Sequence, residues 1–434
     1  MAKKKGNSIL GIVLIIAAVF IWQYLKKENG GDPPSGNTNQ TVITEEMHNS
    51  MISVIDLGAN FYEQQIVAQN INEQEALINT IGKISSFSDV ASCGLSNDNS
   101  TIWIKYVSGV RSFIITKPME ESSGEDKYSN IENDLPNRRV LHAGVFSAPP
   151  PNKKKAIVLE PFDHNGSGGL KDSSPEKIVS TLQESGFEVK YARNSDVTIN
   201  LLTTLNKYDV IYIHTHSGYN EDDVFLMSGE KVTAAKTNLY ENKYGNSVDF
   251  GTVDGEKGYC ITPEFFKSIK GFPNSLVYVS GCNTLKNNSM ANALKTAGVS
   301  VYLGYNNYMM KGYATANTDV MFFKYLTKDG LSVSDALDKK PNNHYKKSHP
   351  FYSLSIGSLK TNGNINMTLG ISTDILIREL KAEHKSLSVE LNALNDKIQN
   401  DMYSSQVTVW EAKMTKIRIR QKEIYQRVLE LKNQ

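Results

Sequence analysis

Short apolar runs alternate with amphipathic segments through the middle of the chain. The apolar runs cover residues 156–162, 187–192, 208–216, 275–282 and 299–305. Segments with apolar residues at helical spacing lie between and after them, at residues 174–185, 197–207, 289–298 and 314–330. Strands that alternate with helices are typical of a mainly parallel sheet with helices on both faces. The pattern therefore predicts an α/β domain over residues 155–370, with ligands at the carboxyl ends of its strands.

The most continuous apolar run lies near the amino terminus. Residues 8–25 read SILGIVLIIAAVFIWQYL and contain no charge, while lysines flank both ends of the run. This length is just sufficient for a helix that spans a membrane. A cleavable signal peptide is the alternative, but no small-x-small cleavage site follows the run. We therefore expect residues 1–25 to be a single-pass membrane anchor, and the extra amino-terminal charge favours an extracytoplasmic position for the bulk of the chain.

Two polar stretches enclose a small region after this run. Residues 26–44 and 118–154 are rich in Gly, Pro, Asn or charged residues and have little to bury, so both are expected to be linkers. Between them, apolar residues at helical spacing are followed by a hairpin pattern at residues 100–116. Residues 45–117 are therefore predicted to form a small α+β module, and a propeptide is one role for it.

Two amphipathic seams end the chain. The first steps by three and four residues from Leu380 to Ile398, and the second runs from Trp410 to Leu431. A polar stretch separates them, so residues 371–434 are predicted to form an antiparallel helical hairpin. The hairpin either packs within the molecule or binds a partner or a second copy of the chain.

Charge and cysteine content exclude several classes of protein. Over 434 residues the chain has 47 basic and 46 acidic side chains, a formal net charge of +1, so no global field favours nucleic acid. The cysteines are Cys93, Cys260 and Cys282, which are too few for a disulfide scaffold and lack the spacing of a zinc site. No cofactor is expected, and a requirement for calcium is neither supported nor excluded.

Two of the predicted strands end in residues capable of nucleophilic chemistry. The run VIYIHTHSG places His214 and His216 at the end of one strand, and LVYVSGC places Cys282 at the end of the next. Neighbouring parallel strands end at the same sheet edge, where an imidazole and the thiol can meet. Histidine can take the thiol proton, and glycine lets backbone N–H groups approach a substrate carbonyl.

A purely structural interpretation of these residues also stands. A cysteine at the end of an apolar strand is commonly a small buried hydrophobe, and both histidines can be buried and hydrogen-bonded. Spacing alone does not establish that an imidazole contacts Cys282.

The order of these motifs resembles that of the caspase-like cysteine peptidases, and within them the gingipain, clostripain and CHAT group. That family has a hydrophobic strand ending in His-Gly and a second strand ending in a small residue and Cys. Downstream, the helix, the Gly-bearing strand, the long helix and a G-x-S-x-x-x-A ending at residues 330–336 are also similar. The resemblance covers roughly half of the chain and implies a caspase-like three-layer sandwich.

Carried over to this chain, the resemblance implies that Cys282 is the nucleophile of an endopeptidase and His216 the general base. Gly218 and the amide of Cys282 would form the oxyanion hole. Ser217 stands where the family has glycine directly after the histidine, which puts the role of Gly218 in question. His214 is the alternative base.

The loop after the first strand contributes to specificity in that family. Here it carries Glu160 and Asp163, and a carboxylate at the bottom of the first substrate pocket would pair with Arg or Lys. We name Asp163 for that role, although a turn-forming Asp in a Gly-rich loop is the simpler interpretation.

A specificity for basic residues would permit self-processing. Arg138, Arg139 and residues Lys153 to Lys155 precede the predicted catalytic domain, so cleavage there would release the small module and the anchor. Solvated linker charges are the simpler interpretation of these residues.

Two other functions are considered. The glycines of residues 165–169 suggest nucleotide binding only weakly, because their loop is long and no Walker motif is present. The stronger alternative is a catalytically inactive caspase-like scaffold that binds partners through its helical hairpin.

Overall fold

The computed structural model describes residues 42–116, 120–121, 154–164, 169–170, 173–219, 223–308, 310–311, 318–339, 357–369, 373–401 and 405–432. The predicted anchor of residues 1–25 lies outside these residues, as do Arg138, Arg139 and most of the two predicted linkers. Within the described ranges, no helix combines the length and apolar character needed to cross a membrane.

A mainly parallel sheet forms the centre of the predicted domain. Among the described residues it has six strands in the order β15-β13-β12-β7-β5-β6. Their bounds are β5 (Lys155–Glu160), β6 (Glu188–Arg193), β7 (Val210–His214), β12 (Leu276–Ser280), β13 (Val301–Tyr305) and β15 (Leu359–Gly363). Only β15, which the sequence did not predict, pairs antiparallel with its neighbour. The α/β class and the parallel order are thus confirmed.

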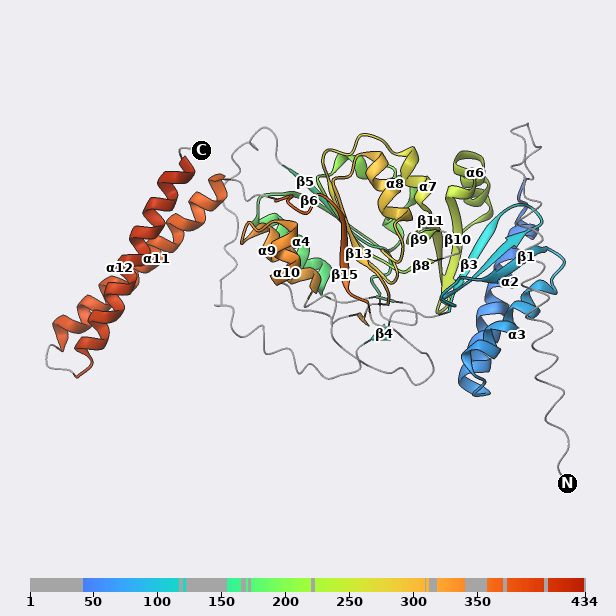
Figure 1. Cartoon of the computed structure of the whole chain (residues 1–434), viewed down its shortest axis with the longest axis horizontal. Coiled ribbons are helices and arrows are strands. Elements are labelled where there is room, and N and C mark those ends of the chain that lie inside the picture. The colour runs from blue at the N-terminus through green and yellow to red at the C-terminus, as the bar shows by residue number, and fades with distance from the viewer. Residues whose placement is uncertain are drawn as a thin grey trace, which may run out of the picture. The chain divides into compact units, whose positions relative to one another are not determined.

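Helices cover both faces of this sheet because its strands are apolar on both sides (Figure 1). On β12, Tyr278 packs with α9, whereas Val277 and Val279 belong to the cluster that contains α8. One face carries α4 (Ser174–Glu184), α9 (Val320–Thr327) and α10 (Val333–Lys339), and the other carries α5 (Ile199–Leu202), α7 (Pro263–Ser268) and α8 (Ser289–Ala297). The helix predicted at residues 197–207 is shorter than expected, since α5 gives way to the 3₁₀ turn η4 (Leu205–Lys207).

A second sheet was not foreseen from the sequence. Its described strands follow the order β1-β2-β3-β10-β11-β9-β8, and only β3 and β10 pair in parallel. Their bounds are β1 (Val90–Leu95), β2 (Thr101–Tyr106), β3 (Arg111–Ile115), β8 (Ser217–Tyr219), β9 (Val224–Met227), β10 (Val248–Val253) and β11 (Glu256–Ile261). A further short parallel pair joins β4 (Glu120–Glu121) to β14 (Met310–Lys311).

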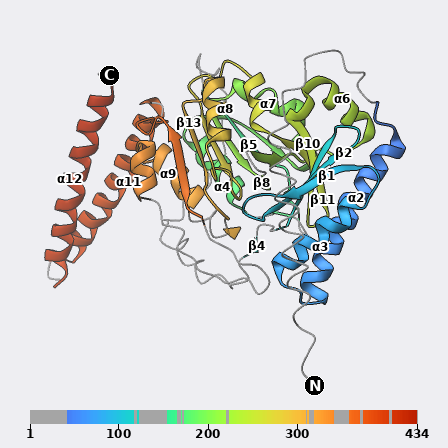
Figure 2. The same cartoon turned by 45° about the vertical axis from the view of Figure 1, so that its right-hand side comes forward.

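The predicted module of residues 45–117 contains the expected helices and hairpin, but it shares this second sheet with later residues. Its helices are α2 (Glu45–Glu63), continued by the π-helical η1 (Gln64–Ala68), and α3 (Glu73–Ser85). Residues 112–114 of β3 pair with residues 250–252 of β10. Figure 2 shows β1 and β2 beside β10 and β11, with α2 and α3 against them. The predicted module boundary near residue 117 therefore separates strands of one continuous sheet.

Strand pairing across this boundary is reinforced by side chains. Arg111 on β3 contacts Asp249 on β10 through two hydrogen bonds, of 3.2 and 2.7 Å. Lys257 on β11 forms a 2.8 Å ion pair with Asp56 on α2. Helix α6 (Ala234–Tyr244), which η5 (Gly245–Ser247) follows, receives a further contact, because Asn238 hydrogen-bonds the backbone of Ile43.

The chain ends in the predicted hairpin of α11 (Thr373–Asn400) and α12 (Val407–Lys432). Its ion pairs join Lys413 to Glu390 and Arg420 to Glu383. A later residue of α12 thus pairs with an earlier residue of α11, so the two helices are antiparallel. Leu394, Met414 and Ile417 form the centre of their interface.

Candidate functional site

The two strands that carry the candidate residues are neighbours. β7 and β12 pair in parallel, and His214, the last residue of β7, lies directly opposite Ser280, the last residue of β12. The amide of Thr215 extends this pairing by donating to the carbonyl of Ser280 at 3.0 Å. The sequence-based expectation that both strands end at one sheet edge is therefore confirmed.

Cys282 lies in a tight turn immediately after β12. Asn283 has a φ of 59°, in the left-handed region that asparagine tolerates better than most residues. Gly281 is enclosed, since a Cβ there would lie 2.6 Å from Ser217 Oγ and 2.7 Å from the carbonyl oxygen of Thr215. Only glycine fits this position, and the turn presents Cys282 beside the segment that follows β7.

Ser217, the residue that departs from the family pattern, contacts this turn directly. Its hydroxyl donates to the carbonyl of Cys282. The hydrogen bond ties the residue after His216 to the backbone of the candidate nucleophile. The serine therefore has a positioning role that the sequence alone did not reveal.

His216 lies on the short connection between the two sheets. The chain leaves the six-stranded sheet at His214 and enters the second sheet at Ser217. The carbonyl of His216 accepts the amide of Met227 at 2.9 Å, and its ring meets Phe162 edge-on at 4.9 Å between centroids. His216 and Cys282 are 3% and 4% exposed, so a substrate would reach them only after a local opening.

Glu160 is buried within the protein, and its substrate-binding role stays a prediction. Its carboxylate is fully buried, accepts the hydroxyl of Tyr191, and lies 3.8 Å from Nδ1 of His214. Burial raises the pKa of Glu160, while the hydrogen bonds from His214 and Tyr191 oppose that rise. A carboxylate that orients an imidazole is common beside catalytic bases, so His214 keeps its place as the alternative base.

Asp163 already has a basic partner within the chain. The guanidinium of Arg193 contacts Asp163, and it also lies 3.4 Å from Glu176 and 3.9 Å from Glu160. Asp163 is 7% exposed, whereas the Arg193 side chain is 39% exposed. A substrate arginine would therefore have to share or displace Arg193, and the specificity role of Asp163 stays a prediction.

Gly218 has a packing role that is independent of catalysis. It pairs with Phe225 across β8 and β9, and a Cβ at Gly218 would lie 2.3 Å from Cζ of that ring. This close approach explains why glycine occupies the position. Its part in an oxyanion hole remains a prediction.

A buried carboxylate beneath the site was missed in the sequence. Asp319 accepts hydrogen bonds from Ser280 at 2.5 Å, Tyr212 at 2.9 Å and Tyr305 at 2.7 Å, and from Tyr278. Burial raises its pKa, and these hydroxyl donors oppose the rise. One signal was available in the sequence: polar-tipped side chains alternate on one face of the two strands, Tyr212 and His214 on β7 and Tyr278 and Ser280 on β12. Asp319 thus connects β7, β12 and β13 to the start of α9, and one of its partners, Ser280, is two residues before Cys282.

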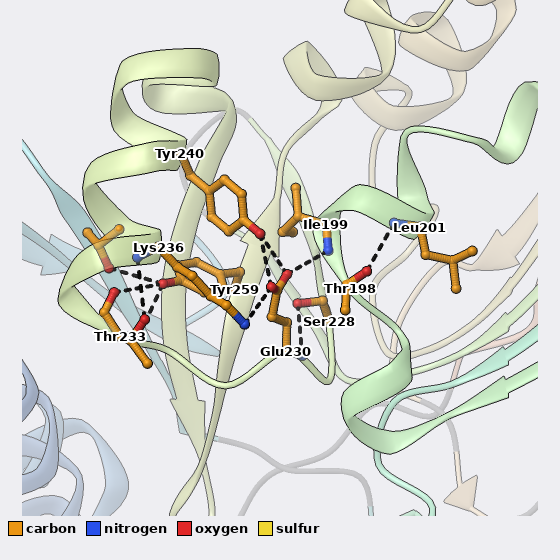
Figure 3. A network of polar contacts seen from close by, with 10 residues as sticks. Thr198, Ile199, Leu201, Ser228, Glu230, Thr233, Lys236, Tyr240 and Tyr259 are labelled. Carbon is orange, nitrogen blue, oxygen red and sulfur yellow. Dashed lines mark hydrogen bonds and ion pairs between the residues drawn. The ribbon is translucent and has the colours of Figure 1, made fainter.

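A second polar cluster surrounds Glu230, in the connection between β9 and α6 (Figure 3). Its carboxylate accepts the amide of Ile199 at 2.8 Å and the hydroxyl of Tyr240, and pairs with Lys236 at 2.8 Å. Its oxygens thus have partners from α5 and α6. We interpret this cluster as a structural joint between those helices.

Sites for metals and ligands are sparse in the part of the chain that the structure describes. It contains no group of three or more His, Cys, Asp or Glu side chains arranged to hold a metal ion. A shallow depression of about 420 Å³ lies on α12, lined by residues such as Val409 and Lys416, and its lining contains no His, Cys, Asp or Glu side chain. The Cys282 turn is therefore the stronger candidate for chemistry.

No model of a protein family matches the chain, and no curated protein matches it. Its function is accordingly argued from its own residues.

Proposed function

We propose that the chain is a cysteine endopeptidase in which Cys282 is the nucleophile and His216 the general base. The observation that supports this most directly is the parallel pairing of β7 and β12, together with the hydrogen bond from Ser217 to the Cys282 carbonyl. These contacts bring the His216 and Cys282 segments together at the sheet edge where α/β proteins bind ligands.

In this mechanism His216 removes the proton of the Cys282 thiol. The thiolate sulfur bonds to the scissile carbonyl carbon, and backbone amides, that of Cys282 among them, bind the oxyanion. The imidazolium then protonates the leaving amine as the C–N bond breaks, which leaves a thioester. Water, deprotonated by His216, attacks the thioester, releases the new carboxyl group and restores the thiol. These steps involve no cofactor.

Three features of the substrate and the setting complete the proposal. Cleavage after Arg or Lys would use Asp163, with Arg193 displaced from it. Membrane attachment would use residues 8–25. Self-processing would be confined to Arg138, Arg139 or Lys153, because Lys154 and Lys155 join the sheet, where Lys155 opens β5 and the Lys154 ammonium donates to Leu369.

A panel of fluorogenic peptides with Arg, Lys, Asp, Leu or Ala before the scissile bond tests this proposal. The full chain is compared with Cys282→Ser, His216→Ala and His214→Gln. Residues 118–434 alone are unsuitable, because they lack the strand that pairs with β10. Turnover that is lost with Cys282→Ser and His216→Ala supports the proposal. Loss with His214→Gln but not with His216→Ala would assign the base to His214.

Specificity is tested separately with Asp163→Asn. A preference for Arg or Lys that this variant abolishes, while hydrolysis of any other accepted peptide persists, supports the role of Asp163. An unchanged preference would remove Asp163 from the proposal.

The scaffold remains a second candidate because the site is closed. His216 and Cys282 are almost fully buried, as expected for a site without turnover. Thiol-directed peptide probes separate the two functions. Cys93 and Cys260 are internal controls, because burial raises the pKa of both thiols, to about 11 for Cys93. Preferential labelling of Cys282 favours the peptidase, whereas equal inertness of all three thiols favours the scaffold.

A further inference from the structure

The turn between β1 and β2 is a rigid polar structure. Its central residue, Asp98, accepts hydrogen bonds through Oδ1 from the hydroxyls of Ser96 and Ser100, at 2.9 and 2.6 Å, and from the amide of Ser100 at 3.1 Å. Ser96 and Ser100 are each 1% exposed. A turn with buried serines has packed against another part of the protein.

That other part is the loop that carries Cys282. The second oxygen of Asp98, Oδ2, lies 3.6 Å from the ammonium of Lys286, four residues after the candidate nucleophile. Tyr308 joins the same contact, because its side chain lies close to Ser100 on the turn and to Asn283 on the loop. Tyr308 is 6% exposed, so the contact is a packed interface.

Charge also links the two segments. After burial itself, the charge of Asp98 raises the pKa of Tyr308, and Cys282 contributes in the same direction. The Tyr308 side chain is therefore close enough to both residues to sense both charges. The charged groups of this contact are Asp98, from the amino-terminal region, and Lys286, from the loop that carries the thiol.

The turn is held in place by much more than this contact. β2 and β3 pair along residues 101–115, and β3 pairs in turn with β10. Arg111 and Asp249 reinforce that junction, as does the ion pair between Asp56 and Lys257. A cut between residues 122 and 153 would leave all of these contacts intact.

We infer that the β1–β2 turn, residues 96–100, is one wall of the Cys282 site, and that Asp98 is a positioning residue that holds the loop carrying the thiol, through Lys286, and Tyr308 against this turn. The amino-terminal module therefore remains part of the functional protein after any cleavage between residues 122 and 153. Its role as a catalytic wall rests on the proposed function, whereas its effect on the thiol does not.

The first experiment measures iodoacetamide alkylation of Cys282 in the full chain against pH, with the modified peptide quantified by mass spectrometry. Asp98→Asn removes an anion near the thiolate, so we expect the midpoint of the alkylation profile to fall by about 0.5 pH unit. Asp98→Glu should restore the midpoint. Asp329→Asn, which removes the partner of Lys339 in a 2.8 Å ion pair elsewhere, should leave it unchanged.

An altered plateau rate would mean something different from an altered midpoint. A wall that had merely loosened would expose Cys282 and raise the rate at every pH without moving the midpoint. A midpoint that is the same in wild type and Asp98→Asn would overturn the positioning role. A moved midpoint in a protein that hydrolyses no peptide would uphold this inference while the peptidase proposal failed.

The second experiment tests retention of the module. A protease recognition sequence inserted between residues 130 and 131 is cleaved, and the product is passed over a size-exclusion column in native buffer. We expect both fragments to elute together with an unchanged Cys282 alkylation profile. Separation of the fragments, or a several-fold faster alkylation after the cut, would overturn the wall and identify the module as a removable cap.

Discussion

The ion pair between Arg111 and Asp249 gives a prediction that can be worked through from the structure. Asp249 is 1% exposed, and burial raises its pKa to about 6 although Arg111 opposes the rise. The rise of about 2 pKa units above the ordinary value of 3.8 corresponds to about 3 kcal/mol at pH 7. At pH 7 the charged Asp249 carboxylate therefore already lowers the free energy of unfolding of the wild-type chain by this amount.

Arg111→Met should destabilise the protein by less than the loss of a buried ion pair usually does. Without the guanidinium, Asp249 can become protonated, and protonating an ordinary carboxyl group at pH 7 costs about 4 kcal/mol. The added electrostatic penalty is therefore only about 1 kcal/mol. The lost hydrogen bond to the carbonyl of Asn246 adds about 1 kcal/mol. We expect a total of about 2 kcal/mol, against about 3–5 kcal/mol for an ion pair whose remaining charge cannot be neutralised.

The same reasoning fixes the pH dependence. Because the pKa of Asp249 is higher in the folded chain than in the unfolded chain, the folded chain binds more protons between about pH 4 and pH 6, and its stability falls as pH rises through that window. Loss of Arg111 raises this pKa further and extends the window upward. The difference in stability between wild type and Arg111→Met should therefore shrink as pH is lowered from 8 to 5.

Urea unfolding of residues 42–434 at several pH values measures this difference, with the fluorescence of Trp103 on β2 as the probe and Trp410→Phe as the common background. In an Asp249→Asn background, Arg111→Met should cost only about 1 kcal/mol at every pH. Glu241, whose pKa is raised to about 7 by burial and the charge of Asp249, is replaced by Gln in every protein compared. A difference of 4 kcal/mol or more that does not change between pH 5 and 8 would refute the reasoning.

Three further changes have defined outcomes. Gly218→Ala places a Cβ 2.3 Å from the Phe225 ring, and we expect a loss of about 1–3 kcal/mol in urea unfolding that Phe225→Leu partly restores. Ser217→Ala removes the hydrogen bond to the Cys282 carbonyl, and it should lower stability by about 1 kcal/mol and peptide turnover by more than 10-fold; unchanged turnover would remove Ser217 from the positioning of the nucleophile. Asp319→Asn replaces an acceptor of four hydroxyl groups and should cost about 2–3 kcal/mol, whereas a neutral result would show that its donors find other partners.

The strands of the six-stranded sheet were predictable because each is a short apolar run bounded by polar residues. β7 and β12 are buried on both faces, which gives continuous hydrophobic sequences that a local pattern can detect. Parallel order followed from the helices between them. The adjacency of the His214 and Cys282 segments could be predicted for the same reason, since parallel strands end at a common edge.

The second sheet was missed for a different physical reason. Its strands β8 and β9 are only three and four residues long, and β3 pairs with β10 across more than 130 residues of sequence. No local pattern records such a long-range partner. One signal was available, because Asp254 and Gly255 have φ values of 47° and 82°, and an Asp-Gly pair between alternating residues is a strong hairpin signal.

The partners of the acidic residues could not be predicted at all. The sequence shows that Glu160 and Asp163 follow a strand, but the contact of Asp163 with Arg193 depends on how β5 and β6 pair. The same holds for Asp98, whose partner Lys286 lies in another part of the chain. Contacts between side chains from distant segments depend on how the strands and loops pack in three dimensions, which no local sequence pattern records.

The connection between the two sheets has a mechanical consequence. Only Thr215 and His216 separate β7 from β8, and two residues of extended chain span at most about 7 Å. Thr215 hydrogen-bonds to both sheets. Its amide donates to the carbonyl of Ser280 on β12, and its hydroxyl donates to the carbonyl of Met227 on β9 at 2.6 Å. If one sheet slid over the other, this short connection would move with it, and the distance between the His216 imidazole and the Cys282 thiol would change. In the proposed peptidase, a force or a bound molecule that sheared the sheets would change the reaction rate without contacting either residue.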